Sequence, residues 1–225
     1  MNEGGRWQRF LGRRRLLAGG AGHSLLIGLS AENARPAASR IIDVGGWDLP
    51  PLAFRMADAE TGREVTARDF RGKVMLLYFG YTNCQDVCPM TLHNIALVLK
   101  RLGKEASRVR ALFVTVDPHR DTLAVLRQYT HLFAPGIAGL RGTADRLAAL
   151  ARRYHLGYSV SPATASHPYE VTHSSAIYVF DAHGKARLLI PSLDNSTSDI
   201  AGTASALARL LAQPAGAPAV LGQLL

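Results

Sequence analysis

Two cysteines, Cys84 and Cys88, are the residues of this chain whose type and spacing point most directly to chemistry. They are the only cysteines among 225 residues, and they lie in the segment Tyr78-Phe-Gly-Tyr-Thr-Asn-Cys84-Gln-Asp-Val-Cys88-Pro89. Two cysteines placed at random would rarely fall this close together, so the spacing indicates a shared task. A close pair of thiols serves either in redox chemistry or in a metal site.

The segments around the two cysteines predict a loop that joins a buried strand to a helix. The apolar run 74–79 is bounded by glycines, as a strand buried on both faces would be, and residues 91–102 carry apolar side chains at helical spacing. Pro89 is tolerated in the first turn of a helix, which places Cys88 in that turn. The positive end of the helix dipole is expected to lower the thiol pKa there.

The remaining apolar segments predict one domain over residues 41–212, with a flexible tail at 213–225. Parallel strands joined by crossover helices, followed by a hairpin and a closing helix, are typical of a thioredoxin-like α/β/α sandwich with a central mixed sheet. The expected segments are a hairpin at 52–65, a strand at 109–116, a helix at 122–133, a short segment at 137–140, a helix at 146–154, strands at 174–180 and 186–190, and a helix from 198 to 211.

A third ligand would distinguish a metal site from a redox pair. Two thiolates suit Cu(I), but they are an incomplete set for structural zinc, which takes four protein ligands. His173 opens the predicted strand 174–180, and it would lie beside the cysteines if that strand runs antiparallel to the first two. His119 follows the second parallel strand and is the reserve candidate. The other histidines are expected in loops, on helix surfaces or in the N-terminal segment: His23, His93, His131, His155, His167 and His183.

The charge of the chain is concentrated at its N-terminus. The net charge is +9, and residues 1–40 contain seven arginines against two glutamates. The rest of the sequence has neither a run of basic residues nor an aromatic stripe that would stack on bases, so we expect no nucleic-acid binding.

Residues 1–40 have the pattern of an export signal or an N-terminal membrane anchor. Arg13-Arg14-Arg15 precede a mostly apolar, glycine-rich stretch that ends near Ser30. This stretch is shorter than the ~20 residues that span a bilayer, which favours a signal, of Sec or twin-arginine type, over an anchor. Either one predicts an exported domain, periplasmic or anchored in the inner membrane facing the periplasm, in an oxidising compartment.

Three sequence blocks, in this order and at these separations, form a specific signature. The blocks are the cysteine segment above, Phe113-Val-Thr-Val-Asp117-Pro118-His-Arg120-Asp121-Thr122, and Thr172-His173-Ser-Ser-Ala-Ile-Tyr-Val-Phe180-Asp181. Together they resemble the Sco/SenC family of copper metallochaperones, and the likeness extends over about residues 48–211. The chain departs from the usual family pattern at Gln85, where a proline is common, and at Asn83, which is often a histidine.

The resemblance implies a domain that binds one copper ion, Cu(I) or Cu(II), through Cys84, Cys88 and His173. It also implies delivery of copper to the CuA-bearing subunit of a terminal oxidase, by docking at the membrane surface. Another copper chaperone and a thioredoxin-like reductant are further expected partners. Asp86 matches an aspartate of the family's loop, where it would either tune the thiols or cap the following helix.

Two other functions would use the same cysteines. A thiol-disulfide oxidoreductase would reduce the oxidase subunit's cysteines before metallation, through Cys84 or Cys88. The three-residue spacer, and Thr172-His173 where such an enzyme would carry a proline, argue against it. A peroxidase is less supported still, because the loop lacks the proline and threonine that would precede its nucleophile. Copper delivery is the preferred prediction, and reductase activity can coexist with it.

Overall fold

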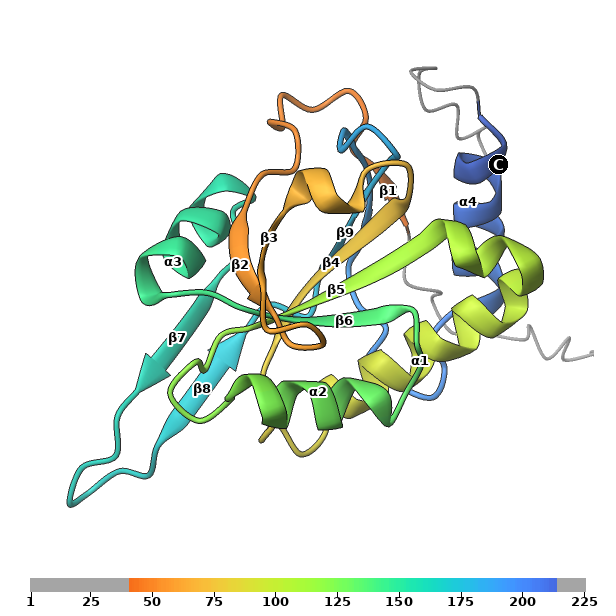
Figure 1. Ribbon diagram of the computed structural model, residues 1–225. Coiled ribbons are helices and arrows are strands. Elements are labelled where there is room, and N and C mark those ends of the chain that lie inside the picture. Colours follow the sequence, from red (N-terminus) through yellow and green to blue (C-terminus); the bar gives the residue numbers. More distant parts are fainter. Residues whose placement is uncertain (1–40, 214–225) are drawn as a thin grey trace, which may run out of the picture. The chain divides into compact units, whose positions relative to one another are not determined.

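The computed structural model describes residues 41–213 of the chain (Figure 1). The expected signal or anchor at 1–40 and the expected tail at 213–225, apart from Gln213, lie outside these residues. Within the described part, no helix combines the length and apolarity that crossing a membrane requires.

An eight-stranded mixed sheet forms the centre of the domain, in the order β1-β10-β9-β4-β5-β6-β2-β3. The inner strands β4, β5 and β6 are parallel to one another. Every other pair of neighbouring strands in the sheet is antiparallel. The described residues form ten strands, of which β7 and β8 lie outside this sheet: β1 (Ile42–Asp43), β2 (Arg55–Asp58), β3 (Glu64–Thr66), β4 (Val74–Gly80), β5 (Val109–Thr115), β6 (Ile137–Arg141), β7 (Tyr158–Ser161), β8 (Glu170–His173), β9 (Ile177–Phe180) and β10 (Ala186–Ile190).

Helices cover both faces of this sheet (Figure 1). The buried residues of β4 alternate between two apolar clusters, as the period of a strand requires. One cluster includes side chains of α1, α2 and α4, and the other includes side chains of α3. The predicted α/β/α sandwich is therefore confirmed. The helices are α1 (Val87–Leu102), α2 (Leu123–His131), α3 (Ala144–Arg153) and α4 (Ile200–Ala212), with short 3-10 helices η1 (Ala67–Phe70) and η2 (Gly103–Arg108).

One edge of the sheet gathers the segments that matter for function. The parallel strands β4 and β5 both end there, so the cysteine loop after β4 and the turn 117–121 after β5 are neighbours. The antiparallel strand β9 begins at the same edge, because Ile177 pairs with Tyr78 near the end of β4. Residues just before β9 are thereby brought beside the cysteines.

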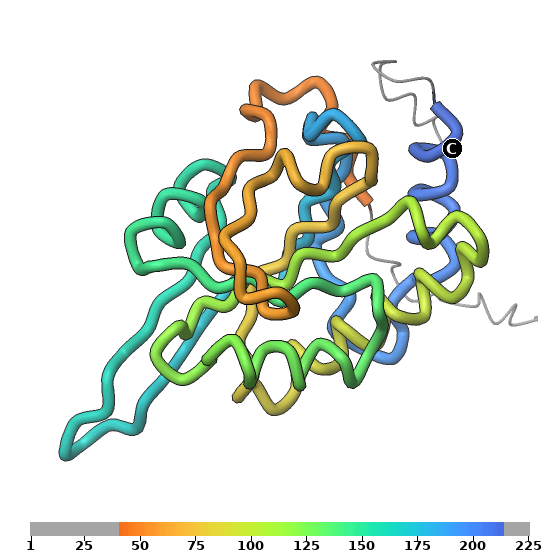
Figure 2. Tube along the Cα trace, in the orientation of Figure 1, coloured from red at the N-terminus to blue at the C-terminus, as the bar shows by residue number. Residues whose placement is uncertain are grey.

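The region before β9 differs from the sequence expectation. His173 is the last residue of β8, and the predicted strand at 174–180 begins only at Ile177. Strands β7 and β8 form a separate hairpin outside the main sheet, which extends away from it (Figure 2). Ser174 continues that hairpin through its N–H, which donates to the Gly157 carbonyl at 2.8 Å. The chain then turns toward β9.

Candidate metal centre

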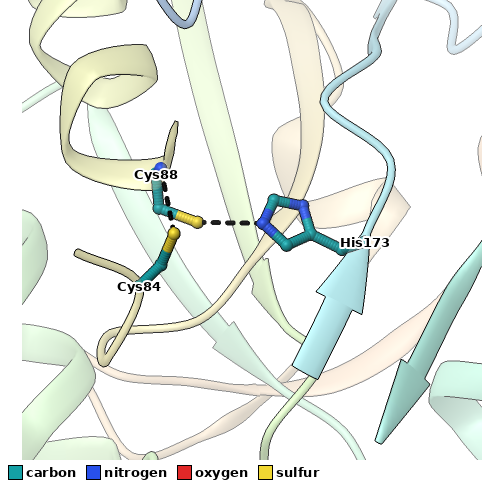
Figure 3. Close-up of side chains that lie close together, drawn as sticks. All are labelled: Cys84, Cys88 and His173. Carbon is teal, nitrogen blue, oxygen red and sulfur yellow. Dashed lines mark hydrogen bonds between the residues drawn. The ribbon is translucent and has the colours of Figure 1, made fainter. Parts of the chain in front are cut away.

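Three side chains converge at the edge of the sheet described above. The sulfurs of Cys84 and Cys88 and a ring nitrogen of His173 lie within 4.8 Å of one another. The Cys88 Sγ to His173 Nε2 distance is 3.2 Å, and Figure 3 shows the three side chains pointing toward one another. Among the described residues, no other group of histidine, cysteine or carboxylate side chains has this arrangement. The three predicted site residues are thus together.

Cys88 is positioned by the first turn of α1 and by a close approach of β4. It lies in the first turn of the helix, as predicted, where it is the second residue, and it is fully buried. Gly80, at the end of β4, leaves the space that its sulfur occupies: a Cβ at this position would lie 2.8 Å from Cys88 Sγ and would also overlap the Phe113 ring. A side chain at position 80 would therefore displace the thiol.

The two thiols have opposite acidities. Hydrogen bonds from the Cys88 thiol and from the backbone N–H groups of Cys88 and Asp86 lower the pKa of Cys84 to about 4. The hydrogen bond between the two thiols and the burial of Cys88 raise the pKa of Cys88 above its usual range. The expectation of a lowered pKa for Cys88 was wrong, because burial and the neighbouring sulfur outweigh the helix dipole there. The half-exposed Cys84 is the thiolate of the pair.

His173 presents one nitrogen to the sulfurs with its lone pair free. Its Nδ1 lies 3.0 Å from the Ser174 carbonyl oxygen, which can only accept, so Nδ1 carries the proton in the neutral ring. Nε2 is then the free donor atom facing Cys88. The rings of Tyr78 and Tyr81 stand edge-on to the imidazole at centroid distances of 5.9 and 5.8 Å. The ring is therefore held in one orientation.

The cysteine loop is tied to the turn after β5 by Asp121. This fully buried carboxylate accepts hydrogen bonds from the Thr82 N–H at 3.0 Å and from the Thr82 hydroxyl at 2.6 Å. It also accepts one from the Thr115 hydroxyl at 2.6 Å. Thr82 is two residues before Cys84, so these bonds fix the start of the loop.

Other residues singled out from the sequence lie outside the cluster. His119 is exposed in the turn after β5 and is not one of the converging side chains. Asp86 occupies the N-cap position of α1, but its exposed side chain makes no capping hydrogen bond. Sequence reasoning missed Gly80, Tyr78 and Tyr81 as parts of the site, although all three lie in the cysteine segment that it quoted.

The donor set fits a soft metal ion held by few ligands. Two sulfurs and one imidazole suit Cu(I), whereas the described residues supply no fourth ligand for a structural zinc site. Both cysteines are free thiols, so the same pair can also exchange with a disulfide.

Named relatives have similar sequences and structures. The chain is 39% identical over 155 residues to Protein SCO2 homolog, mitochondrial, of Bos taurus, covering 68% of this chain and 56% of that protein. It therefore spans about half the length of that relative. The structure of Bradyrhizobium japonicum ScoI with copper bound matches 69% of this chain and 97% of its own, at 34% identity and a TM-score of 0.60. Yeast Sco1 with copper bound matches 75% and 92%, at 31% identity and a TM-score of 0.65.

A family model also matches more than half of the chain. The model described as SCO1/SenC matches residues 52–209, which include β2 to α3, the β7–β8 hairpin and most of α4. All three blocks that resembled the family in the sequence fall within this range. This chain belongs to the SCO1/SenC family.

Proposed function

We propose that this protein is a copper chaperone that holds one copper ion through Cys84 Sγ, Cys88 Sγ and His173 Nε2. The observation that carries the proposal is the convergence of these three atoms within 4.8 Å. Membership of the SCO1/SenC family and the copper-bound structures of two relatives support it. Two thiolates and a neutral imidazole are ligands that Cu(I) favours.

The acceptor is the dithiol CuA site in a subunit of a terminal oxidase. Transfer by ligand exchange needs one ligand that an incoming thiolate can reach, and Cys84 is the partly exposed member of the set while Cys88 is buried. An acceptor thiolate would bind copper as Cys84 leaves, and the second acceptor thiolate would complete the transfer. The domain works on the exported, periplasmic side of the membrane that carries the oxidase.

The test is copper binding by the reduced full-length chain and by its His173→Ala variant. We expect one tightly bound copper per chain and a large loss of affinity in the variant, because the third ligand is gone. The Cys84–Cys88 disulfide should still form in His173→Ala, since neither thiol is altered. The matched control is His119→Ala, which removes an exposed imidazole at the same edge of the sheet.

Two outcomes would contradict the proposal. Unchanged copper affinity in His173→Ala would remove this histidine from the ligand set. A strong loss in His119→Ala would mean that the reserve histidine is the ligand instead.

A second candidate function, thiol-disulfide reduction, is favoured by the asymmetry of the two thiols. The Cys84 thiolate would attack an acceptor disulfide and form a mixed disulfide, and Cys88 would then displace the acceptor. The acceptor gains two electrons while Cys84 and Cys88 become oxidised. A protein without copper affinity but with a reversible dithiol–disulfide couple, unaffected by His173→Ala, would indicate this function.

A further inference from the structure

The third donor of the site is carried by an element with little support of its own. His173 ends β8, and β8 pairs only with β7, in a hairpin separate from the eight-stranded sheet (Figure 2). An isolated two-stranded hairpin is marginally stable in water. The place of His173 therefore depends on what anchors this hairpin to the domain.

One anchor is a buried carboxylate in the turn after β5. Asp117 is fully buried, and its Oδ1 accepts a hydrogen bond from the Tyr169 hydroxyl at 2.8 Å. Its Oδ2 pairs with the guanidinium of Arg120. That guanidinium in turn lies over the Tyr169 ring, 4.1 Å from its centroid. Asp117 thus binds the hydroxyl of Tyr169 and Arg120 covers the face of its ring. Tyr169 directly precedes the first residue of β8.

The turn that carries this anchor is itself fixed to the main sheet. Arg141, at the end of β6, donates two hydrogen bonds to the Pro118 carbonyl, at 3.1 and 2.7 Å. The Asp121 N–H donates to the Asp117 carbonyl at 2.9 Å, which closes the turn. Because Asp121 also holds the loop before Cys84, this single turn is attached to both halves of the metal site.

A second contact runs from the same arginine toward the histidine. The Arg120 guanidinium lies 5.8 Å from the centroid of the Tyr81 ring, and Tyr81 stands edge-on to His173 at 5.8 Å. Arg120 therefore lies against one tyrosine from the hairpin and one from the cysteine loop. Neither tyrosine nor the arginine is one of the three converging side chains.

We propose that Asp117, Arg120 and Tyr169, which we name the hairpin clamp, are positioning residues for copper binding. The clamp holds β8 against the turn 117–121 and so keeps His173 Nε2 in range of the two sulfurs. This inference rests on the proposed copper function, because positioning matters only if His173 is a ligand. Residues that orient metal ligands in this way typically change metal affinity 10- to 100-fold when they are altered.

The test is Tyr169→Phe, which removes only the hydroxyl that donates a hydrogen bond to Asp117. The ring stays under Arg120 and the carboxylate stays paired, so the variant is expected to fold. We expect about a 10-fold loss of copper affinity, a changed thiolate-to-Cu(II) charge-transfer spectrum and faster hydrogen exchange of the β8 amides. The matched control is Tyr158→Phe on the partner strand, whose hydroxyl makes no hydrogen bond among the described residues while its ring packs on Phe79.

A double-mutant comparison shows whether the clamp acts through His173. In a His173→Ala background, Tyr169→Phe should cause no further loss of copper affinity, since there is no imidazole left to position. An equal loss in that background would overturn the proposal, as would equal affinities for Tyr169→Phe and Tyr158→Phe.

Hydrogen exchange separates this proposal from the copper function itself. If the unaltered protein binds no copper, the proposed function fails, and the clamp is then judged on the apo protein alone. Faster exchange of the β8 amides in Tyr169→Phe than in Tyr158→Phe would support a clamp on the hairpin. Equal exchange would overturn it.

Discussion

The two cysteines illustrate how neighbouring residues of one type acquire different properties. Cys88 is enclosed by β4 and α1, whereas Cys84 lies in the loop and receives hydrogen bonds from the Cys88 thiol and from backbone N–H groups. Tyr78 donates a hydrogen bond to the Cys88 sulfur at 3.6 Å, but the hydrogen bond with Cys84 and burial outweigh it and keep the pKa of Cys88 raised. Negative charge is therefore stabilised on Cys84, the more exposed sulfur, where a partner can reach it.

This asymmetry predicts selective alkylation of Cys84 in the reduced apo protein. Because the pKa of Cys84 is lowered to about 4, its thiolate persists as pH falls from 8 to 5 and is lost only near pH 4. Iodoacetamide labelling followed by mass spectrometry should find Cys84 modified at pH 5.5 while Cys88 stays unmodified. Cys84→Ser is the control and should abolish labelling at that pH. A labelling midpoint near pH 8.5, the usual thiol value, would contradict the prediction.

Gly80 should be intolerant of any side chain, for a reason of space. A methyl group there would overlap the Phe113 ring and Cys88 Sγ, both in the core. We expect Gly80→Ala to lower the free energy of unfolding by about 1–3 kcal/mol, the usual cost of overpacking, and to weaken copper binding as well. Urea unfolding measures the first effect. Gly46→Ala, where no atom lies within 4 Å of the added carbon, is the control and should change neither property.

Among the elements, the turn 117–121 bonds to both parts of the site although none of its residues belongs to the converging cluster. It follows β5, whose end lies beside the end of β4, and it bonds to the cysteine loop through Asp121 and to the hairpin through Asp117. Two acidic side chains of one short turn therefore organise two segments that are far apart in the sequence. Both carboxylates are fully buried.

Asp121→Ala should destabilise the domain and loosen the cysteine loop. Removing the carboxylate leaves the Thr82 N–H and two threonine hydroxyls without their acceptor in a buried place, which costs about 3 kcal/mol of unfolding free energy. Urea unfolding and Cys84 labelling rates measure the two effects. Asp69→Ala is the control, because Asp69 also accepts hydrogen bonds from a threonine N–H and hydroxyl, but at the exposed cap of a 3-10 helix. The decrease in unfolding free energy should be much smaller for Asp69→Ala than for Asp121→Ala. Equal losses would contradict the role of burial.

The β7–β8 hairpin shows what a sequence pattern of this length does not reveal. Only Val171 is buried in β8, between exposed neighbours, so the alternation is too short to separate a strand from a loop. The apolar run from Ile177 onward is a much stronger pattern. It led to the prediction that His173 opens the strand that became β9, whereas His173 is the last residue of β8. The histidine was nevertheless placed at the correct edge of the sheet, because β9 is antiparallel to β4, which is the condition on which that placement depended.

At the scale of the whole molecule, the sequence was most informative where burial is greatest. The central strands and the helices that cover them follow from apolar periodicity, and they determine which loops share an edge. The three residues of the candidate metal centre were predicted to lie together because those loops carry them. The supporting contacts, such as Asp117 with Tyr169, join residues 52 positions apart through single hydrogen bonds. A periodic pattern carries no information about such contacts.

Copper should stabilise the whole domain, because its ligands come from two segments joined only through the fold. Cys84 and Cys88 flank the start of α1, while His173 lies 85 residues beyond Cys88. An ion that binds only the folded arrangement adds stability as RT ln(1 + [L]/Kd), about 2.7 kcal/mol when free copper is 100 times Kd. Thermal unfolding under reducing conditions, with copper held at a defined free concentration by a competing chelator, should show this increase.

The same titration on His173→Ala tests whether the stabilisation requires both segments. Without the imidazole, copper can bind only the cysteine pair, and two thiolates separated by three residues can also come together in an unfolded chain. Binding to the unfolded state reduces the stabilisation, so the copper-dependent rise in unfolding temperature should shrink well beyond what the weaker affinity alone predicts. An undiminished rise in His173→Ala would mean that the hairpin takes no part in holding the ion. No rise in either protein would mean that copper does not bind the folded domain selectively.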